Sequence, residues 1–167
     1  MAATVEQIKS LRELTGAGIM DCKNALEKTD GNQDKAVDLL RQNGFSQAAK
    51  RSGRDTTEGV VEAYIHTGGR VGALVELGCE TDFVARTPEF RELAHNVAMQ
   101  VAAMNPAYIS EDDMAEDDSR PPAQVTLLLQ PFIKNTSMQV GEIIQELAAK
   151  VGENVRVLRF SRLALGE

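Results

Sequence analysis

The stretch VGALVELGCETDFVARTPEF, residues 71–90, contains in order a strand pattern, a short turn and a helix start. Residues 71–77 are mostly apolar, which is typical of a strand that packs on a core. Thr87 can cap a helix, and Pro88 suits the first helical turn. Residues 81–85, TDFVA, are therefore expected to form a short surface turn, where a rigid scaffold often holds functional side chains.

The tip of this turn places the carboxylate of Asp82 beside the large apolar ring of Phe83. Two interpretations are open. In the first, Asp82 caps the turn and Phe83 folds back into the core, which composition alone favours because most Phe side chains are buried. In the second, the tip projects as a wedge into a partner protein.

Apolar periodicity predicts a small sheet around this stretch. Residues 60–66, 70–79 and 154–163 alternate or run apolar in the manner of strands, and Thr67-Gly68-Gly69 predicts a hairpin turn between the first two. Helical spacing predicts further helices at residues 87–105, 124–130 and 140–151. We therefore expect one three-stranded antiparallel sheet packed with helices.

The N-terminal part of the chain predicts three short helices that pack as a bundle. They are expected at residues 4–14, at residues 19–26 and after Asn32. Asn43-Gly44 is a strong C-terminal stop for the third, although residues 45–51 can add a turn or two. In the first helix, the spacing predicts an apolar face made of Val5, Ile8, Leu11 and Leu14.

A polar segment separates the two parts. Residues 52–57 carry a glycine and no apolar side chain, and they form the best candidate linker. The expected domains are a three-helix bundle at 1–53 and an α+β part at 54–167. The overall fold class is therefore α+β.

Charge and composition exclude several functions. The chain has 167 residues and a formal net charge of −7, which argues against a broad nucleic-acid-binding surface. Residues 111–120 hold six acidic residues against one basic residue, and the surrounding segment, about 110–122, is expected to be a mobile loop. It lacks the central glycine of a calcium-binding EF-hand loop. No signal peptide or membrane span is recognisable, so a cytoplasmic protein is expected.

The Cys and His residues form no recognisable site. Cys22, Cys79, His66 and His95 lack metal-ligand spacing, and both Cys are expected to behave as small apolar residues. Neither His has a nucleophile or carboxylate constellation nearby in the sequence. Phosphate-loop, serine hydrolase and zinc protease motifs are also absent from the sequence. We therefore expect neither an enzyme nor a bound cofactor or metal.

Three runs resemble the bacterial and organellar elongation factor Ts family, and they are spread over nearly the whole chain. They are residues 11–26, LRELTGAGIMDCKNAL; residues 79–86, CETDFVAR; and residues 130–134 together with 152–156, QPFIK and GENVR. The resemblance implies a ubiquitin-associated-like N-terminal bundle followed by an α+β core. It also implies a guanine nucleotide exchange factor for elongation factor Tu, acting on the GDP-bound and nucleotide-free GTPase.

The resemblance also implies site residues. In that family the turn matching Thr81, Asp82, Phe83 and Val84 enters the GTPase near its Mg²⁺ site. The stretch matching Ile19, Met20, Asp21, Cys22 and Lys23 touches the nucleotide domain of the GTPase. Many relatives carry a long helical insertion between the equivalents of Ile109 and Leu127, where this chain has the acidic loop. The chain has one copy of the sheet, whose edge a second chain would cover, so a homodimer binding two GTPase molecules is expected.

Two other functions remain open at this stage. The chain could be a ubiquitin-associated-like adaptor, in which the N-terminal bundle binds a partner and the Asp82-Phe83 turn is structural. A small enzyme using His66 or His95 is the weaker alternative.

Overall fold

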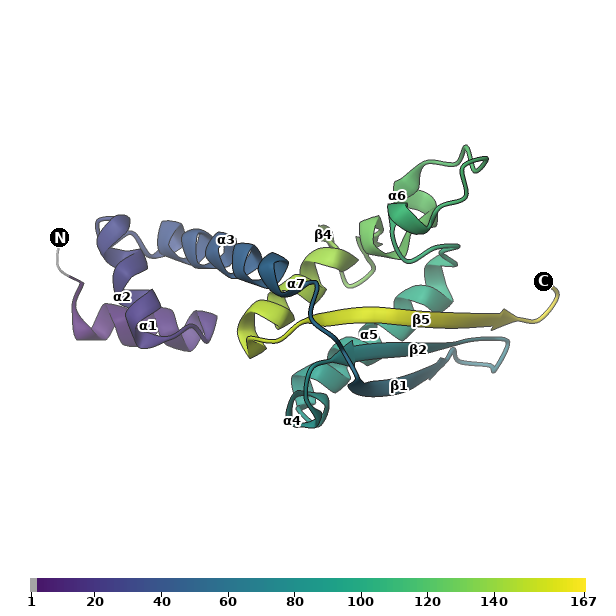
Figure 1. Ribbon diagram of the computed structural model, residues 1–167, viewed down its shortest axis with the longest axis horizontal. Helices are drawn as coiled ribbons and strands as arrows, with labels where there is room; N and C mark the ends of the chain where they lie inside the picture. The colour runs from purple at the N-terminus through teal and green to yellow at the C-terminus, as the bar shows by residue number, and fades with distance from the viewer. Residues whose placement is uncertain (1–2) are drawn as a thin grey trace. The chain divides into compact units, whose positions relative to one another are not determined.

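The computed structural model describes residues 3–167 (Figure 1). Within this range the chain forms two compact units, one ending at Arg51 and the other running from Ser52 to Glu167. No helix in the described range is long and apolar enough to cross a membrane.

The first unit is a bundle of three helices: α1 (Val5–Thr15), α2 (Ile19–Lys28) and α3 (Gln33–Arg51). Thr4 caps α1 through a reciprocal pair of hydrogen bonds with Gln7, and Gly16 ends it in the left-handed conformation, φ 69°. The helices bury a small common core, made of Leu11, Cys22, Ala25, Leu26 and Ala36. Because each helix is marginal alone, this core supplies most of the stability of the bundle.

Two details of the bundle differ from the sequence prediction. Asn43-Gly44 does not end the third helix, since α3 continues through it to Arg51. An interior glycine costs only about 1 kcal/mol, and the following residues, FSQAAKR, are good enough helix formers to offset it. The apolar face assigned to α1 was also partly wrong, because Val5 and Leu14 are 82% and 66% exposed.

The second unit contains the predicted sheet. Strands β1 (Glu58–Ile65), β2 (Val71–Cys79) and β5 (Val155–Ala164) pair in the order β1-β2-β5, and both pairs are antiparallel. The register of β2 against β5 shifts by one residue between Glu76 and Leu77, which is a β-bulge.

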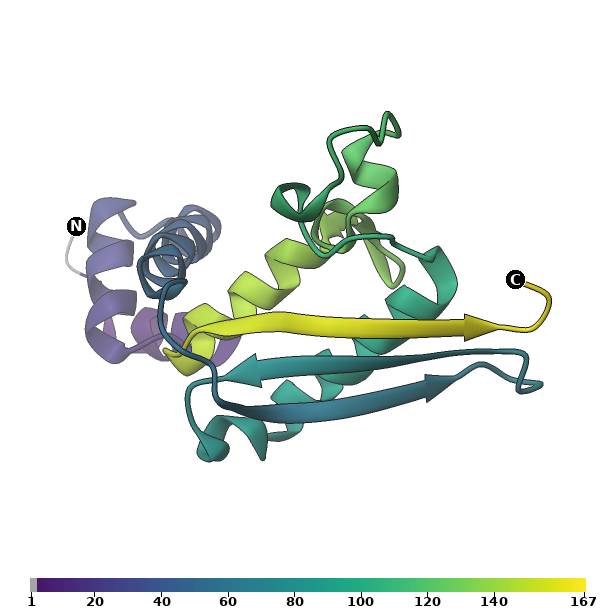
Figure 2. The same ribbon diagram turned by 45° about the vertical axis from the view of Figure 1, so that its right-hand side comes forward.

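Helices of this unit cover one face of the sheet (Figure 2). They are α4 (Asp82–Ala85), α5 (Pro88–Met104) and α7 (Val140–Val151). The largest buried apolar side chains between helices and sheet include Val75, Leu77, Phe90, Val97 and Val101. The opposite face carries exposed apolar side chains, namely Val61, Ile65, Leu74 and Leu163. The α+β fold class, with a three-helix bundle and a three-stranded antiparallel sheet packed with helices, is confirmed.

A second, two-stranded sheet was not predicted. Strands β3 (Pro131–Phe132) and β4 (Asn135–Gln139) form a hairpin just before α7. Buried Gln100 of α5 holds this region, because its Nε2 donates to Gln130 Oε1 at 3.2 Å and its Oε1 accepts from the Ile133 N–H at 2.9 Å. The signal was weak because β3 is only two residues long and begins with Pro, and β4 is mostly polar.

The acidic segment contains more local structure than a featureless loop. Glu111–Asp113 form a 3₁₀ turn, and Ser110 and Asp113 bond each other reciprocally at its start. Arg120 pairs with Asp118 at 2.5 Å and lowers the pKa of that carboxyl well below its usual range. The segment leads into α6 (Pro122–Val125) and a second 3₁₀ turn at Leu127–Leu129, close to the predicted helical segment at 124–130.

Candidate partner-binding site

The stretch TDFVA forms a single helical turn, α4, directly after strand β2. Val84 and Ala85 are only 8% and 5% exposed, so they anchor the turn on the core. The Thr87 hydroxyl donates to the Val84 carbonyl at 2.8 Å and accepts from the Phe90 N–H at 3.3 Å, which ties α4 to the start of α5. The turn is therefore fixed at its C-terminal side.

Phe83 projects from this anchored turn. It is 80% exposed, and among the large apolar residues that the structure describes only Val5 is more exposed. The interpretation in which Phe83 folds back into the core is thus wrong for the isolated chain. Helical geometry explains the result, because Val84 and Ala85 take the inward positions of a four-residue turn and Phe83 is left pointing away.

Asp82, the residue before Phe83, forms an ion pair within its own helical turn. Its Oδ2 pairs with Arg86 Nη2 at 2.7 Å, one helical turn along the chain. Both side chains are substantially exposed, so the pair contributes little to stability. It places two charged groups close to Phe83 in the chain, and protein interfaces combine such polar groups with apolar ones.

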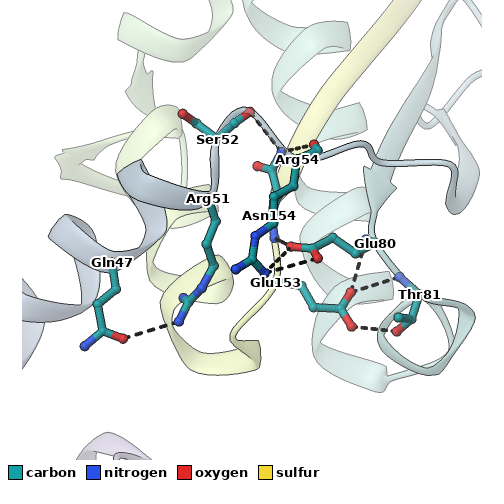
Figure 3. A network of polar contacts seen from close by, with 8 residues as sticks. All are labelled: Gln47, Arg51, Ser52, Arg54, Glu80, Thr81, Glu153 and Asn154. Atoms are coloured by element: carbon teal, nitrogen blue, oxygen red, sulfur yellow. Dashed lines mark hydrogen bonds and ion pairs between the residues drawn. The ribbon is translucent and has the colours of Figure 1, made fainter.

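The N-terminal side of the turn is held by residues that the sequence analysis did not single out (Figure 3). Glu153 Oε2 accepts from the backbone N–H groups of Glu80 and Thr81, at 3.1 and 3.0 Å, and Glu153 Oε1 accepts from the Thr81 hydroxyl at 2.6 Å. Glu153 lies 72 residues from Thr81 in the chain. Spacing alone therefore gave no signal of this contact, although Glu153 falls within the GENVR run.

Cys79 lies buried at the base of the turn, and its thiol donates to the Thr81 carbonyl at 3.2 Å. Burial, and then the nearby Glu153 carboxylate, raise the pKa of this thiol from 9.0 to about 11. The neutral thiol is the form that can donate this hydrogen bond. Cys22 is fully buried in the other unit, so both Cys act as small apolar residues, as predicted.

Cys79 is expected to react at least about 10-fold more slowly with a thiol reagent in the folded chain than in the unfolded chain. Burial shields its sulfur, and the raised pKa lowers the thiolate fraction near pH 8 by more than the higher nucleophilicity of that thiolate offsets. A Cys22→Ala variant isolates this reaction, and absorbance of the released reagent measures it. A folded-state rate equal to the rate in guanidinium chloride would contradict the expectation.

The second predicted contact region lies at the corner between α1 and α2. Ile19 and Met20 are 57% and 62% exposed, and Leu14, just before the corner, is also exposed. Asp21 is exposed, while the half-buried Lys23 lies 3.9 Å from Glu27. Cys22 is the exception among the predicted contact residues, since its side chain lies in the core and donates to Ala17 O at 3.8 Å.

The two His residues have local structural partners. His66 Nδ1 lies 3.0 Å from the Tyr64 hydroxyl, and His95 Nδ1 lies 3.0 Å from Glu62 Oε1. Among residues 3–167, no cluster of three or more His, Cys, Asp or Glu side chains could hold a metal ion.

Comparison with known proteins assigns the chain to a family, and the matched region contains the turn that carries Phe83. The family model described as elongation factor TS matches residues 24–120, which include the whole of α4. The chain belongs to the elongation factor Ts family. Membership makes it a translation elongation factor of protein biosynthesis, and the predicted resemblance is confirmed.

Individual members of the elongation factor Ts family align with nearly the whole chain. The protein from Desulfosudis oleivorans is 46% identical over 190 positions, which cover 96% of each chain. The proteins from Carboxydothermus hydrogenoformans and Thermotoga neapolitana are 45% and 44% identical, over 98% and 100% of this chain and 89% and 99% of theirs. These alignments are longer than the 167 residues of the chain, so the relatives carry residues that it lacks.

Proposed function

We propose that this chain is a guanine nucleotide exchange factor that binds elongation factor Tu in its GDP-bound and nucleotide-free states and promotes release of GDP. It would act by binding alone, without catalytic groups or a cofactor of its own. The observation that carries the proposal is Phe83, an 80% exposed apolar ring on a turn anchored at both ends. The family of the chain supports the choice of partner.

The proposed mechanism uses the turn Thr81–Val84 as a wedge. Bound GDP is held partly through Mg²⁺, which bridges phosphate oxygens and protein ligands of a GTPase. Phe83 would enter a pocket that exists only when the Mg²⁺ ligands have moved, and Asp82 and Thr81 would hold the tip in position. One carboxylate supplies too few ligands to retain the ion, so Asp82 is not assigned as a metal ligand.

Burial of the Phe83 ring alone supplies too little free energy to accelerate GDP release by this mechanism. Burying one Phe side chain contributes about 1.5–3 kcal/mol, whereas a ~10⁴-fold faster release requires about 5.5 kcal/mol. A second contact surface must therefore supply the difference. Because the coupling is reciprocal, nucleotide that rebinds weakens the hold of the factor, which lets it dissociate.

The corner residues Ile19–Lys23 are proposed as that second surface. Ile19 and Met20 offer exposed apolar area, and Asp21 and Lys23 offer charge of both signs. Cys22 would contribute only by packing the corner from within. The N-terminal domain, residues 1–53, is accordingly proposed as a ubiquitin-associated-like binding module, and residues 54–167 as the core and dimerisation domain.

The double variant Met20→Ala/Lys23→Ala is expected to weaken binding to elongation factor Tu by about 10-fold or more, with a change of no more than ~0.5 kcal/mol in the free energy of unfolding. Calorimetric titration and thermal unfolding measure the two quantities. Val5→Ala/Lys9→Ala is the matched control, because it removes an exposed apolar residue and a Lys from α1. Lost stability with unchanged affinity would assign both residues to the bundle instead.

Stopped-flow release of a fluorescent GDP analogue from elongation factor Tu, with excess unlabelled GDP, tests the proposed function directly. Addition of the chain is expected to accelerate release, with saturation at high factor concentration. No acceleration would overturn the proposal and favour the adaptor function, in which the N-terminal bundle alone retains full binding.

We also propose a cytoplasmic homodimer that binds two GTPase molecules, with no direct contact to nucleic acid or membrane. The exposed apolar face of the three-stranded sheet supports the dimer. This face suits a dimer interface better than the sheet edge considered in the sequence analysis. Pairing through the face buries apolar side chains, whereas pairing at an edge joins mainly backbone groups.

A further inference from the structure

Glu153 stands at a point from which it can control the direction of α4. It follows α7, which Gly152 ends in the left-handed conformation, φ 74°, with its N–H bonded to the Ala148 carbonyl at 3.0 Å. This termination turns the chain towards the end of β2. The two carboxylate oxygens then accept three hydrogen bonds from the residues just before α4, Glu80 and Thr81.

The contact is reciprocal (Figure 3). Glu80 Oε1 accepts from the Asn154 N–H at 2.6 Å, so each of the two segments places a carboxylate on the backbone of the other. Asn154 Nδ2 also donates to the carbonyls of Ser52 and Arg54, at 3.0 and 2.8 Å. These hydrogen bonds join three segments that are distant in sequence, around residues 52–54, 80–81 and 153–154, at the base of the turn.

The Thr81 hydroxyl connects these hydrogen bonds to α4. Thr81 is the N-cap residue of α4, yet its side chain makes no capping bond to that helix. Its hydroxyl donates instead to Glu153 at 2.6 Å. A single helical turn has too few internal hydrogen bonds to hold its own direction, so the direction of Phe83 depends on what fixes each end of the turn. At the N-terminal end, Glu153 fixes residues 80 and 81.

We propose that Glu153 is a positioning residue for nucleotide exchange, which fixes the direction of Phe83 through Thr81 without touching the GTPase itself. The inference rests on the proposed function, because it requires Phe83 to be the wedge. A wedge that is aimed incorrectly still leaves the rest of the interface intact. Loss of Glu153 should therefore lower the rate of release at saturation more than the affinity for the GTPase.

The test is a double-mutant cycle of Glu153→Gln and Phe83→Ala in the stopped-flow release assay. Glu153→Gln keeps the shape of the side chain but removes the charge and one of the two acceptor oxygens. It is expected to lower the saturating release rate by about 10-fold, while the half-saturating concentration changes by less than about 3-fold. In the Phe83→Ala background the same change is expected to cost less than about 2-fold, because its effect passes through the ring.

Asp118→Asn is the matched control, since it also neutralises a hydrogen-bonded carboxylate, here in the acidic segment and paired with Arg120. It should leave the release rate unchanged. Thr81→Val is a milder test that removes only the 2.6 Å bond to Glu153, and it should give an intermediate loss of rate. Thermal unfolding confirms that each variant is folded in the assay.

The outcomes separate the two proposals. If Phe83→Ala slows release and Glu153→Gln does not, the positioning role is overturned and the wedge stands. If the two losses multiply in the double variant, Glu153 acts by another route and the inference is also overturned. If Phe83→Ala has no effect, the wedge itself fails, and the inference fails with it.

Discussion

Replacement of Phe83 by Ala is expected to slow the saturating release of GDP from elongation factor Tu by about 10- to 150-fold, which corresponds to a loss of ~1.5–3 kcal/mol of apolar burial. The fold should not suffer, because the side chain is 80% exposed in the free chain. A substitution at such a position changes the free energy of unfolding by about 0.5 kcal/mol or less. The loss would therefore belong to the complex alone.

The measurement is stopped-flow release of a fluorescent GDP analogue, with wild type and variant compared at saturating concentration. Val5→Ala is the matched control, since Val5 is 82% exposed on α1 and also loses apolar surface. Equal release rates for wild type and Phe83→Ala would contradict the wedge mechanism. Acceleration would then have to come from the corner Ile19–Lys23 and the rest of the interface.

Local patterns were sufficient to predict most of the fold. The signals that located these elements act over a few neighbouring residues. They are the helix caps at Thr4 and Thr87, the glycines of the hairpin at residues 67–69, and the period-two apolar alternation of the strands. For that reason the bundle, the three long strands and helix α5 lie close to their predicted positions.

The errors had two different causes, one in local helix propensity and one in a tertiary contact. Asn43-Gly44 has the chemistry of a helix stop, yet α3 passes through it. The β3–β4 hairpin has little strand pattern of its own and depends on the buried amide of Gln100 from α5. At Asn43-Gly44 the helix-forming residues that follow outweigh the stop signal, whereas the contact of Gln100 cannot be seen in a window of neighbouring residues.

The candidate site shows the same division. The sequence located the turn at residues 81–85 but left the direction of Phe83 open, because an aromatic ring suits both a core and an interface. Phe83 is exposed because Val84 and Ala85 take the positions of the turn that face the core. Glu153 was missed as a determinant because the contact joins residues 72 positions apart.

The sheet leads to the second prediction with a large effect. The face opposite α5 exposes Val61, Ile65, Leu74 and Leu163, at 68%, 66%, 52% and 79%, across all three strands. An apolar patch of this kind on a small protein usually marks an interface. Glu76 and Arg159 pair on the same face, so two copies related by a two-fold axis could exchange these charges while their apolar residues pack.

Leu74→Lys is expected to convert the proposed dimer into a monomer, because Leu74 lies on the central strand and a buried unpaired charge costs far more than an exposed one. Light scattering should give twice the chain mass of 18.1 kDa for wild type and a single chain mass for the variant. Val5→Lys, which places the same charge on an exposed residue of α1, should leave the mass doubled. A monomeric wild type at micromolar concentration would overturn the dimer.

The same variant tests whether each chain of the dimer acts alone. The turn α4 contacts β1, β2 and α5, and α5 packs on the face opposite the apolar patch, so dimerisation through that patch leaves α4 free. The monomeric Leu74→Lys chain should therefore retain its release rate per chain within about 3-fold. A much larger loss would mean that the second copy contributes to the contact with the GTPase, and two independent GTPase sites per dimer could then no longer be maintained.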